Sequence, residues 1–261
     1  MNTVENIHPS AIIDPSADIH PSAKIGAYAI IGANVSIGAE SIIEPHVVIK
    51  GPTRIGKLNH IFSFACIGDA PQDKKYAGEP TELHIGDNNV IREYCSLNRG
   101  TAQDAFATRI GNNNLLMAYV HVAHDCQIGD HVILANNTTL AGHVHVGDHA
   151  ILGGFTKVHQ FVRIGTHSFM AFDTGLSRDV PPYVMTSGHP ASPRGINKEG
   201  LKRRGFNAEE IKAIMQAYRF LYRNDLKLDE AKLRISELSQ EHNVLKVFNA
   251  FFADSTRSIV R

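Results

Sequence analysis

An aliphatic residue recurs every six positions along most of the chain, and this spacing limits the folds that the chain can adopt. In the N-terminal part isoleucine holds the position without exception, at residues 7, 13, 19, 25, 31, 37, 43, 49, 55, 61 and 67. A period of six is neither the 3.6 of a helix nor the alternation of a strand. Short strands joined by turns produce it, with Gly, Asn, Asp and Pro between the inward-pointing aliphatic residues. The pattern therefore predicts a parallel β-helix of hexapeptide repeats.

Two interruptions of the repeat predict inserted loops. From residue 69 to 84 the in-phase positions fall on Asp73 and Glu79, which are unsuited to a core. A second interruption, at residues 100–109, shifts the frame by one before the repeat continues as far as Leu176. Three hexads form one triangular coil, so we expect roughly eight coils in a prism about 40 Å long.

The repeat is expected to end at Pro181 and Pro182, because proline cannot donate a hydrogen bond to a strand ladder. Residues 188–195 are rich in Gly and Pro and predict a linker. We therefore expect a mainly β protein with a β-helix over residues 1–187 and a C-terminal α-helical domain over residues 188–261.

The apolar period becomes helical in this C-terminal part. Asn207 is placed to cap a helix whose apolar residues form one stripe. Asp229 is expected to cap a second helix, and residues 244–252 are expected to form a third.

Composition argues against nucleic-acid binding, membrane insertion and secretion. Lysine and arginine balance aspartate and glutamate, 26 against 26, so no overall charge favours nucleic acid or an anionic membrane. The first residues have neither the basic start nor the apolar core of a signal peptide, and no apolar run is long enough to span a bilayer. An odd number of cysteines without metal-type spacing favours a reducing compartment, so we expect a cytoplasmic protein. These cysteines are Cys66, Cys95 and Cys126.

A histidine cluster lies within the repeat. Residues 18 apart stack in successive coils, about 4.8 Å apart, so His124 lies over Gly142 and Asp125 lies over His143. These positions fall in turns, where side chains can face solvent. An imidazole beside the exposed N–H of a glycine provides a base and an oxyanion donor, as acyl transfer to a hydroxyl requires. Asp125 can fix the tautomer of a neighbouring histidine.

Other interpretations of the cluster remain open at this point. Each histidine has the alternative role of an ordinary turn residue. Several histidines on stacked coils can also bind zinc, as in a carbonic anhydrase of prism fold. A β-helix can, in addition, be a binding scaffold without catalytic activity.

The chain resembles the acyl-ACP–UDP-N-acetylglucosamine O-acyltransferases of lipid A biosynthesis over essentially its whole length. The motifs that carry the resemblance are Q-D-K-K-Y-A-G-E, H-V-A-H-D-C, L-A-N-N-T-T-L-A-G-H, V-H-Q-F, D-V-P-P-Y-V and N-K-E-G-L-K-R-R-G-F. The resemblance implies a left-handed β-helix, a homotrimer and active sites between neighbouring subunits. Neither the handedness nor the trimer follows from the periodicity.

The resemblance also implies roles for individual residues. His124 would be the general base that removes a proton from the sugar 3-hydroxyl, Asp125 would orient it, and the Gly142 N–H would bind the oxyanion. No metal or cofactor is implied, because the acyl group arrives on the phosphopantetheine of acyl carrier protein. Further residues match positions that contact the sugar, the pantetheine, the nucleotide or the diphosphate: Asp73, Lys75, His121, His143, His159, Gln160, Asn197, Glu199, Arg203 and Arg204.

Three positions depart from the family pattern. Asn98 stands where histidine is frequent and Lys198 where isoleucine is frequent, and neither change is expected to abolish the chemistry. Phe172 matches the position that serves as a hydrocarbon ruler, where a small residue admits a long acyl chain. Phe172 lies two and two-thirds coils beyond His124, roughly 13 Å along the axis, which accommodates on the order of ten carbons.

We therefore expect a metal-independent enzyme that transfers a 3-hydroxyacyl group from acyl carrier protein to the 3-hydroxyl of UDP-N-acetylglucosamine. The alternatives are the N-acyltransferase of the same pathway, a zinc carbonic anhydrase and a scaffold that binds nucleotide without turnover. Acyl carrier protein is acidic, so a local basic surface is expected, for which the candidates are Lys202, Arg203, Arg204, Arg219 and Arg223.

Overall fold

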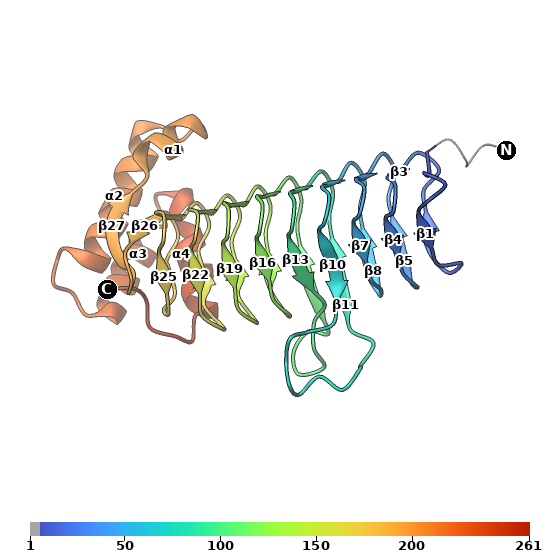
Figure 1. The fold of residues 1–261 in the computed structure, drawn as a ribbon. Coiled ribbons are helices and arrows are strands. Elements are labelled where there is room, and N and C mark those ends of the chain that lie inside the picture. The colour runs from blue at the N-terminus through green and yellow to red at the C-terminus, as the bar shows by residue number, and fades with distance from the viewer. Residues whose placement is uncertain (1–5) are drawn as a thin grey trace.

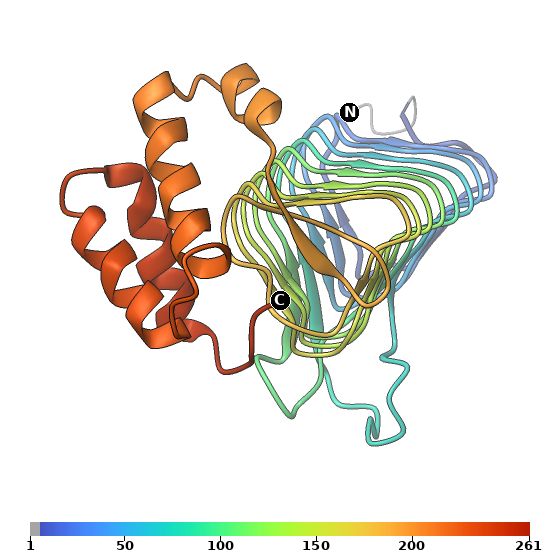
Figure 2. The same cartoon turned by 90° about the vertical axis from the view of Figure 1, so that its left-hand side faces the viewer.

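In the computed structural model, which describes residues 6–261, the chain winds into a β-helix of triangular cross-section (Figure 2). The three faces are sheets of nine, eight and ten strands, and along the repeat each sheet takes every third strand of the chain in parallel. The one antiparallel pair among these strands joins β26 (Val184–Ser187) to β27 (Ser192–Ile196). A helical domain lies beside the prism at its C-terminal end (Figures 1 and 2).

The strands are short, most of them two residues long. The first sheet contains β1 (Ile12–Ile13), β4 (Ile30–Ile31), β7 (Val48–Ile49), β10 (Cys66–Asp69), β13 (Ser96–Asn98), β16 (His121–Val122), β19 (Thr139–Leu140), β22 (Lys157–Val158) and β25 (Gly175–Leu176). The second sheet contains β2 (Asp18–Ile19), β5 (Val35–Ile37), β8 (Thr53–Ile55), β11 (Glu82–Ile85), β14 (Ala107–Ile110), β17 (Gln127–Ile128), β20 (His145–Val146) and β23 (Arg163–Ile164). The third sheet contains β3 (Lys24–Ile25), β6 (Ile42–Ile43), β9 (His60–Ile61), β12 (Val90–Ile91), β15 (Leu115–Leu116), β18 (Ile133–Leu134), β21 (Ile151–Leu152), β24 (Phe169–Met170), β26 (Val184–Ser187) and β27 (Ser192–Ile196).

The six-residue period determines the core. The in-phase aliphatic residues end the strands and point inward, so that Ile31, Ile67 and Leu134 are almost completely buried. The chain turns at the corners with one residue in the left-handed region, also every six residues, as at Asp125 (φ 60°) and His143 (φ 63°). The left-handed region is costly for most non-glycine residues, and Asn, Asp and His tolerate it better than others. The histidine and aspartate of the cluster therefore occupy corner positions.

The two inserted loops are shorter than the sequence suggests. The first covers residues 70–81, because Leu83 to Ile85 already pair with Thr53 to Ile55 of the preceding coil. The second covers residues 99–106, because Thr108 to Ile110 pair with the same segment of β11. Both loops project from the same side of the prism, near the middle of its length (Figures 1 and 2).

The strands continue past the expected stop at Pro181 and Pro182 by one strand, β26, which ends at residue 187, within the expected bounds of the β-helix. Pro181 and Pro182 lie in a turn, where their missing N–H groups are not needed, and β26 still pairs with β24. The expected linker, residues 188–195, is also partly a strand, because β27 pairs with β26.

The helical domain contains α1 (Lys198–Arg203), α2 (Ala208–Tyr222), α3 (Leu228–Leu238), the short 3₁₀ helix η1 (Asn243–Leu245) and α4 (Lys246–Asp254). Asn207 caps α2 as predicted, in a reciprocal capping box with Glu210. The prediction that Asp229 caps α3 is wrong, since Asp229 lies within the first turn and the N-cap residue is Lys227. The helix α1 was not predicted from the sequence.

Candidate active site

The histidine cluster lies where the corners after β16, β19 and β22 stack on one another. The His143 N–H donates to the His124 carbonyl at 3.0 Å, and the Phe161 N–H donates to the Gly142 carbonyl at 3.1 Å, so the column predicted from the spacing of 18 is present. A side chain at Gly142 would collide with the imidazole, since its Cβ would stand 2.5 Å from His124 Cε1. The corner therefore brings the Gly142 backbone directly against the His124 ring.

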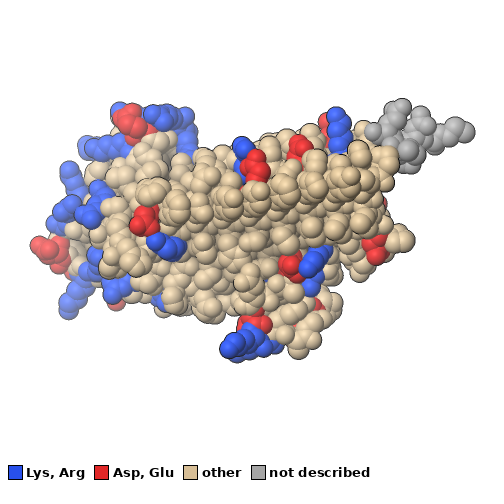
Figure 3. Space-filling view, in the orientation of Figure 1, with Lys and Arg blue, Asp and Glu red and all other residues tan. Residues whose placement is uncertain are grey.

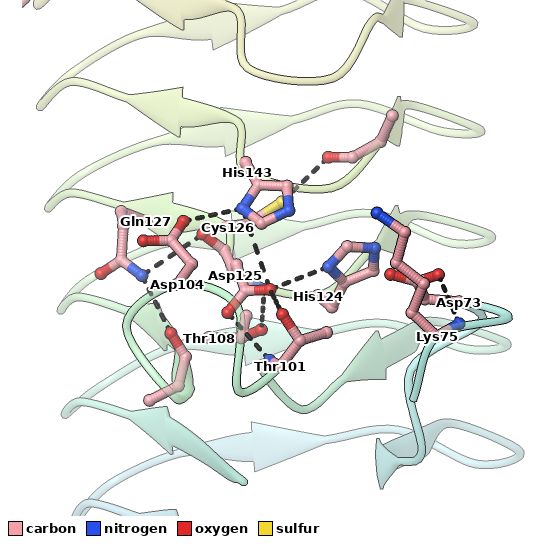
Figure 4. A network of polar contacts seen from close by, with 12 residues as sticks. Asp73, Lys75, Thr101, Asp104, Thr108, His124, Asp125, Cys126, Gln127 and His143 are labelled. Carbon is pink, nitrogen blue, oxygen red and sulfur yellow. Dashed lines mark hydrogen bonds and ion pairs between the residues drawn. The ribbon is translucent and has the colours of Figure 1, made fainter. Parts of the chain in front are cut away.

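His124 and Asp125 form a buried hydrogen-bonded pair. His124 Nδ1 lies 2.9 Å from Asp125 Oδ2, and the two residues are 6% and 0% exposed. The expectation that side chains of this turn face solvent is wrong for both residues, and the second loop contacts the turn at Asp125. Thr101, at the start of this loop, donates to the Asp125 carboxylate from its N–H at 2.9 Å and from its hydroxyl at 2.7 Å (Figure 4).

These hydrogen bonds determine the charge of Asp125 and the tautomer of His124. Burial opposes ionisation of Asp125, but the hydrogen bonds from His124 and Thr101 outweigh it and hold the pKa of Asp125 below its ordinary value. An ionised carboxylate only accepts, so His124 Nδ1 carries the proton that it donates. His124 Nε2 is then left with a free lone pair, as a general base requires.

The Gly142 N–H has no acceptor within the described part of the chain. Its neighbours on either side, Ala141 and His143, both donate to carbonyl groups of adjacent coils. A free amide beside the His124 ring has the placement that an oxyanion donor requires.

Two further histidines surround the pair. His121 Nδ1 lies 2.7 Å from the Ser96 hydroxyl, and burial followed by the charge of His124 lowers the pKa of His121. His143 Nδ1 lies 2.7 Å from the Asp104 carboxylate, and its ring meets the His124 ring edge to face at 5.0 Å. Both histidines therefore belong to the same site as His124.

Four residues of this network were missed from the sequence: Thr101, Asp104, Thr108 and Ser96. Thr108 accepts from the Asp125 N–H at 2.8 Å. The shift of the repeat frame after residue 100 indicates an insertion at this point. It does not indicate which loop side chains turn back onto the coil.

The predicted residues on the next coil are more exposed. His159 lies on the wall of a cavity of about 470 Å³ that Lys157, Leu176 and His189 also line. Gln160 is exposed, and its carbonyl accepts from Arg257 at 3.0 Å. A groove of about 940 Å³ lies elsewhere, between the second sheet and α4.

The first loop carries Asp73 and Lys75, which Figure 4 shows in the same close view as His124. The Lys75 N–H donates to the Asp73 carboxylate at 3.0 Å, so the backbone is turned here. Arg99 anchors the loop, because its guanidinium donates to the Tyr76 hydroxyl at 3.0 Å and to the carbonyls of Gly51 and Gly68.

The predicted nucleotide residues are not brought to His124 within one chain. They lie on or next to α1, which is on the side of the molecule opposite the two loops in both views (Figures 1 and 2). Asn197 caps α1 by accepting from the Gly200 N–H, Glu199 pairs with Lys202 at 2.8 Å, and Arg204 contacts His167 Nδ1 at 3.3 Å. Arg203 is exposed.

Phe172 lies at a different corner from His124, between the third and first sheets. It is 70% exposed and contacts Phe155 edge to face at 5.4 Å. Within one chain Phe172 therefore limits no enclosed acyl tunnel.

The donor atoms of His124, Asp125 and His143 lie within 4.8 Å of one another and form a possible metal group. His124 Nδ1, His143 Nδ1 and Asp125 Oδ2 are, however, already engaged with one another or with Asp104 and Thr101. A zinc ion bound through these atoms would have to replace these hydrogen bonds.

The repeats and the histidine site together define a hexapeptide-repeat transferase. The family model described as "Bacterial transferase hexapeptide (six repeats)" matches residues 6–39 and 107–142, and that described as "Udp N-acetylglucosamine O-acyltransferase; Domain 2" matches residues 179–260.

Solved structures over the whole chain give the family. The UDP-N-acetylglucosamine O-acyltransferase from Moraxella catarrhalis is 49% identical, with a TM-score of 0.96, and the match covers 98% of this chain and 100% of that one. The protein from Acinetobacter baumannii is 47% identical, with the same TM-score and coverage. The UDP-N-acetylglucosamine acyltransferase from Arabidopsis is 36% identical, with a TM-score of 0.83 and coverage of 98% and 100%. The chain belongs to the UDP-N-acetylglucosamine O-acyltransferase family.

The predicted fold class, a left-handed parallel β-helix with a C-terminal helical domain, is confirmed. In the described part of the chain no helix combines the length and apolarity needed to cross a bilayer.

Proposed function

We propose that this protein transfers a 3-hydroxyacyl chain from acyl carrier protein to the 3-hydroxyl of UDP-N-acetylglucosamine, the first step of lipid A biosynthesis. Membership of the UDP-N-acetylglucosamine O-acyltransferase family supports UDP-N-acetylglucosamine as the acceptor. The chemistry rests on one observation, the buried His124–Asp125 pair with the free Gly142 N–H against its ring.

The reaction needs only groups of this site and the two substrates. His124 Nε2 takes the proton of the sugar hydroxyl as its oxygen forms a bond to the thioester carbonyl carbon. The carbonyl oxygen becomes an oxyanion, to which the Gly142 N–H donates. The C–S bond then breaks, the electron pair leaves with sulfur, and His124 returns the proton to the pantetheine thiolate. Asp125 stabilises the imidazolium between the two proton transfers.

Neither metal nor cofactor enters this scheme. Nδ1 of His124 and Nδ1 of His143 each face a carboxylate, at 2.9 Å and 2.7 Å, as expected of rings that donate protons. Residual zinc catalysis would appear as turnover that a chelator abolishes.

We propose a homotrimer that completes each site with residues of a neighbouring subunit. Within one chain His124 and α1 lie apart and Phe172 is exposed. The nucleotide contacts of α1 and the role of Phe172 as acyl ruler therefore require a second copy of the chain. The corner between the third and first sheets carries a column of stacked, exposed aromatic residues that a neighbour would cover. These residues are Tyr28, Phe64, Tyr94 and Tyr119, with exposures of 61%, 50%, 47% and 55%.

The excess of basic residues in the helical domain supports binding of the acidic acyl carrier protein there. Residues 188–261 contain 14 Lys and Arg against nine Asp and Glu, whereas residues 1–187 contain 12 against 17. Figure 3 shows the basic side chains gathered over the helical domain. Of the candidates named for this surface, Lys202 is engaged with Glu199 and Arg204 with His167. Arg203, Arg219 and Arg223 are exposed and remain candidates for contacts with acyl carrier protein. The cytoplasmic location stays a prediction.

The test is an assay of the wild-type protein with UDP-N-acetylglucosamine and 3-hydroxyacyl carrier proteins of graded length, with and without chelator. We expect turnover that survives chelation and is highest near ten carbons. Absence of turnover with any donor would contradict the proposed function. Loss of turnover on chelation would indicate that the histidines bind a metal ion that the reaction needs. A long-chain preference would contradict the role of Phe172 alone.

A further inference from the structure

The second loop brings to the site a carboxylate that the reaction scheme does not use. Asp104 lies at the exposed part of this loop, and its side chain is 45% exposed. Its Oδ2 nevertheless lies 2.7 Å from His143 Nδ1 (Figure 4). An exposed carboxylate that turns back onto a ring in the site indicates a role beyond solvation of the loop.

This contact fixes the orientation of His143. The carboxylate accepts, so His143 Nδ1 carries the proton. The ring is also held on one face, where Phe161 stacks on it with a centroid distance of 4.3 Å and an angle of 6°. His143 is thus held by Asp104 at one edge and by Phe161 at one face.

His143 and His124 have access to the same oxygen atom. Asp125 Oδ2 lies 2.9 Å from His124 Nδ1 and 3.9 Å from His143 Nδ1. Thr101 also donates its hydroxyl to this oxygen, at 2.7 Å. Without Asp104, the His143 N–H would have Asp125 as its nearest carboxylate, and a small ring rotation would bring it into hydrogen-bond distance.

We propose that Asp104 is a positioning residue that holds His143 away from Asp125 and thereby reserves the Asp125 carboxylate for His124. The inference rests on the proposed role of His124 as the base. Asp104 acts through His143 and touches no reacting atom. Its loss weakens the orientation of the base and leaves the binding of the nucleotide sugar largely unchanged.

Kinetics of Asp104→Ala test this role. We expect kcat to fall about tenfold, with KM for UDP-N-acetylglucosamine within twofold of wild type. Asp104→Glu should recover most of the rate, because its carboxylate can still accept from His143. Gln103→Ala, on the same exposed loop, is the matched control and should behave as wild type. Thermal unfolding of each variant checks that the fold is intact.

A double-mutant cycle separates this role from a general effect of the loop. In a His143→Phe background, which keeps the stack on Phe161, Asp104→Ala should cause no further loss. Additive losses, or wild-type kcat for Asp104→Ala, would overturn the proposal.

A crystal structure of Asp104→Ala provides a readout that needs no turnover. We expect His143 Nδ1 to move from 3.9 Å to within about 3.2 Å of Asp125 Oδ2. An unmoved His143 would refute the inference even in an active enzyme. Wild-type protein without turnover would instead refute the proposed function, and the crystal structure would still decide the role of Asp104.

Discussion

Replacing Gly142 with alanine should displace the His124 ring. The new Cβ would stand 2.5 Å from Cε1, 2.7 Å from Nε2 and 3.1 Å from Nδ1 of His124, whereas ordinary contacts begin near 3.4 Å. The ring must therefore move by about 0.9 Å, away from the amide and out of line with Asp125. A misplacement of about 1 Å costs on the order of a hundredfold in rate.

The assay is steady-state turnover with the preferred donor, together with thermal unfolding. We expect Gly142→Ala to lose about a hundredfold in kcat and, through overpacking, about 1 to 3 kcal/mol in stability. Gly32→Ala is the matched control, because its Cβ would meet the Ile49 carbonyl at 3.2 Å in a coil that carries none of the site residues. It should lose at most a little stability and no activity. A Gly142→Ala enzyme with kcat within twofold of wild type would refute the close packing of base and amide.

Three further predictions follow from the loops and the acyl ruler. Thr101→Val removes a hydroxyl that donates to Asp125 and should cost about 1 to 2 kcal/mol of stability at neutral pH, with Thr101→Ser as the control. The pKa of Asp125 in the folded protein lies below its value of about 3.9 in the unfolded chain. The stabilisation by Thr101 is therefore complete above about pH 3.9 and is lost as the pH falls through the pKa of the folded protein. A difference in unfolding free energy that does not depend on pH would contradict the prediction. Tyr76→Phe removes the hydroxyl that ties the first loop to Arg99 and should raise KM for UDP-N-acetylglucosamine about three- to tenfold at unchanged kcat, whereas an unchanged KM would show that the loop is held by other contacts. Phe172→Gly should shift the preferred acyl chain beyond about ten carbons, and an unchanged preference would remove Phe172 as the ruler.

The sequence predicts the β-helix and its column of stacked residues because both depend on a strict period. Ile67 and Leu134 are buried at the positions that the period requires, and Gly142 lies against His124 because they are 18 residues apart. Turn chemistry was also sufficient for the Asn207 cap.

What depends on the path of the inserted loops could not be predicted. Thr101 is 24 residues from Asp125, so only the folding of the second loop brings the two together. Asp125, which the repeat alone places at a solvent-facing turn, is completely buried and accepts two hydrogen bonds from this loop. Strand β27 was missed because a Gly- and Pro-rich segment carries no strand pattern, and it forms only because β26 offers it an edge.

The most direct test of His124 as the base is turnover by His124→Ala, measured with the donor that the wild-type enzyme prefers. The unfolding temperature and oligomeric state of the variant are first checked to match those of the wild type. We expect a loss of about 10²- to 10⁴-fold in kcat, the range that a positioned general base contributes, with binding of UDP-N-acetylglucosamine retained. A folded His124→Ala protein that turns over at close to the wild-type rate would show that His124 is not the general base.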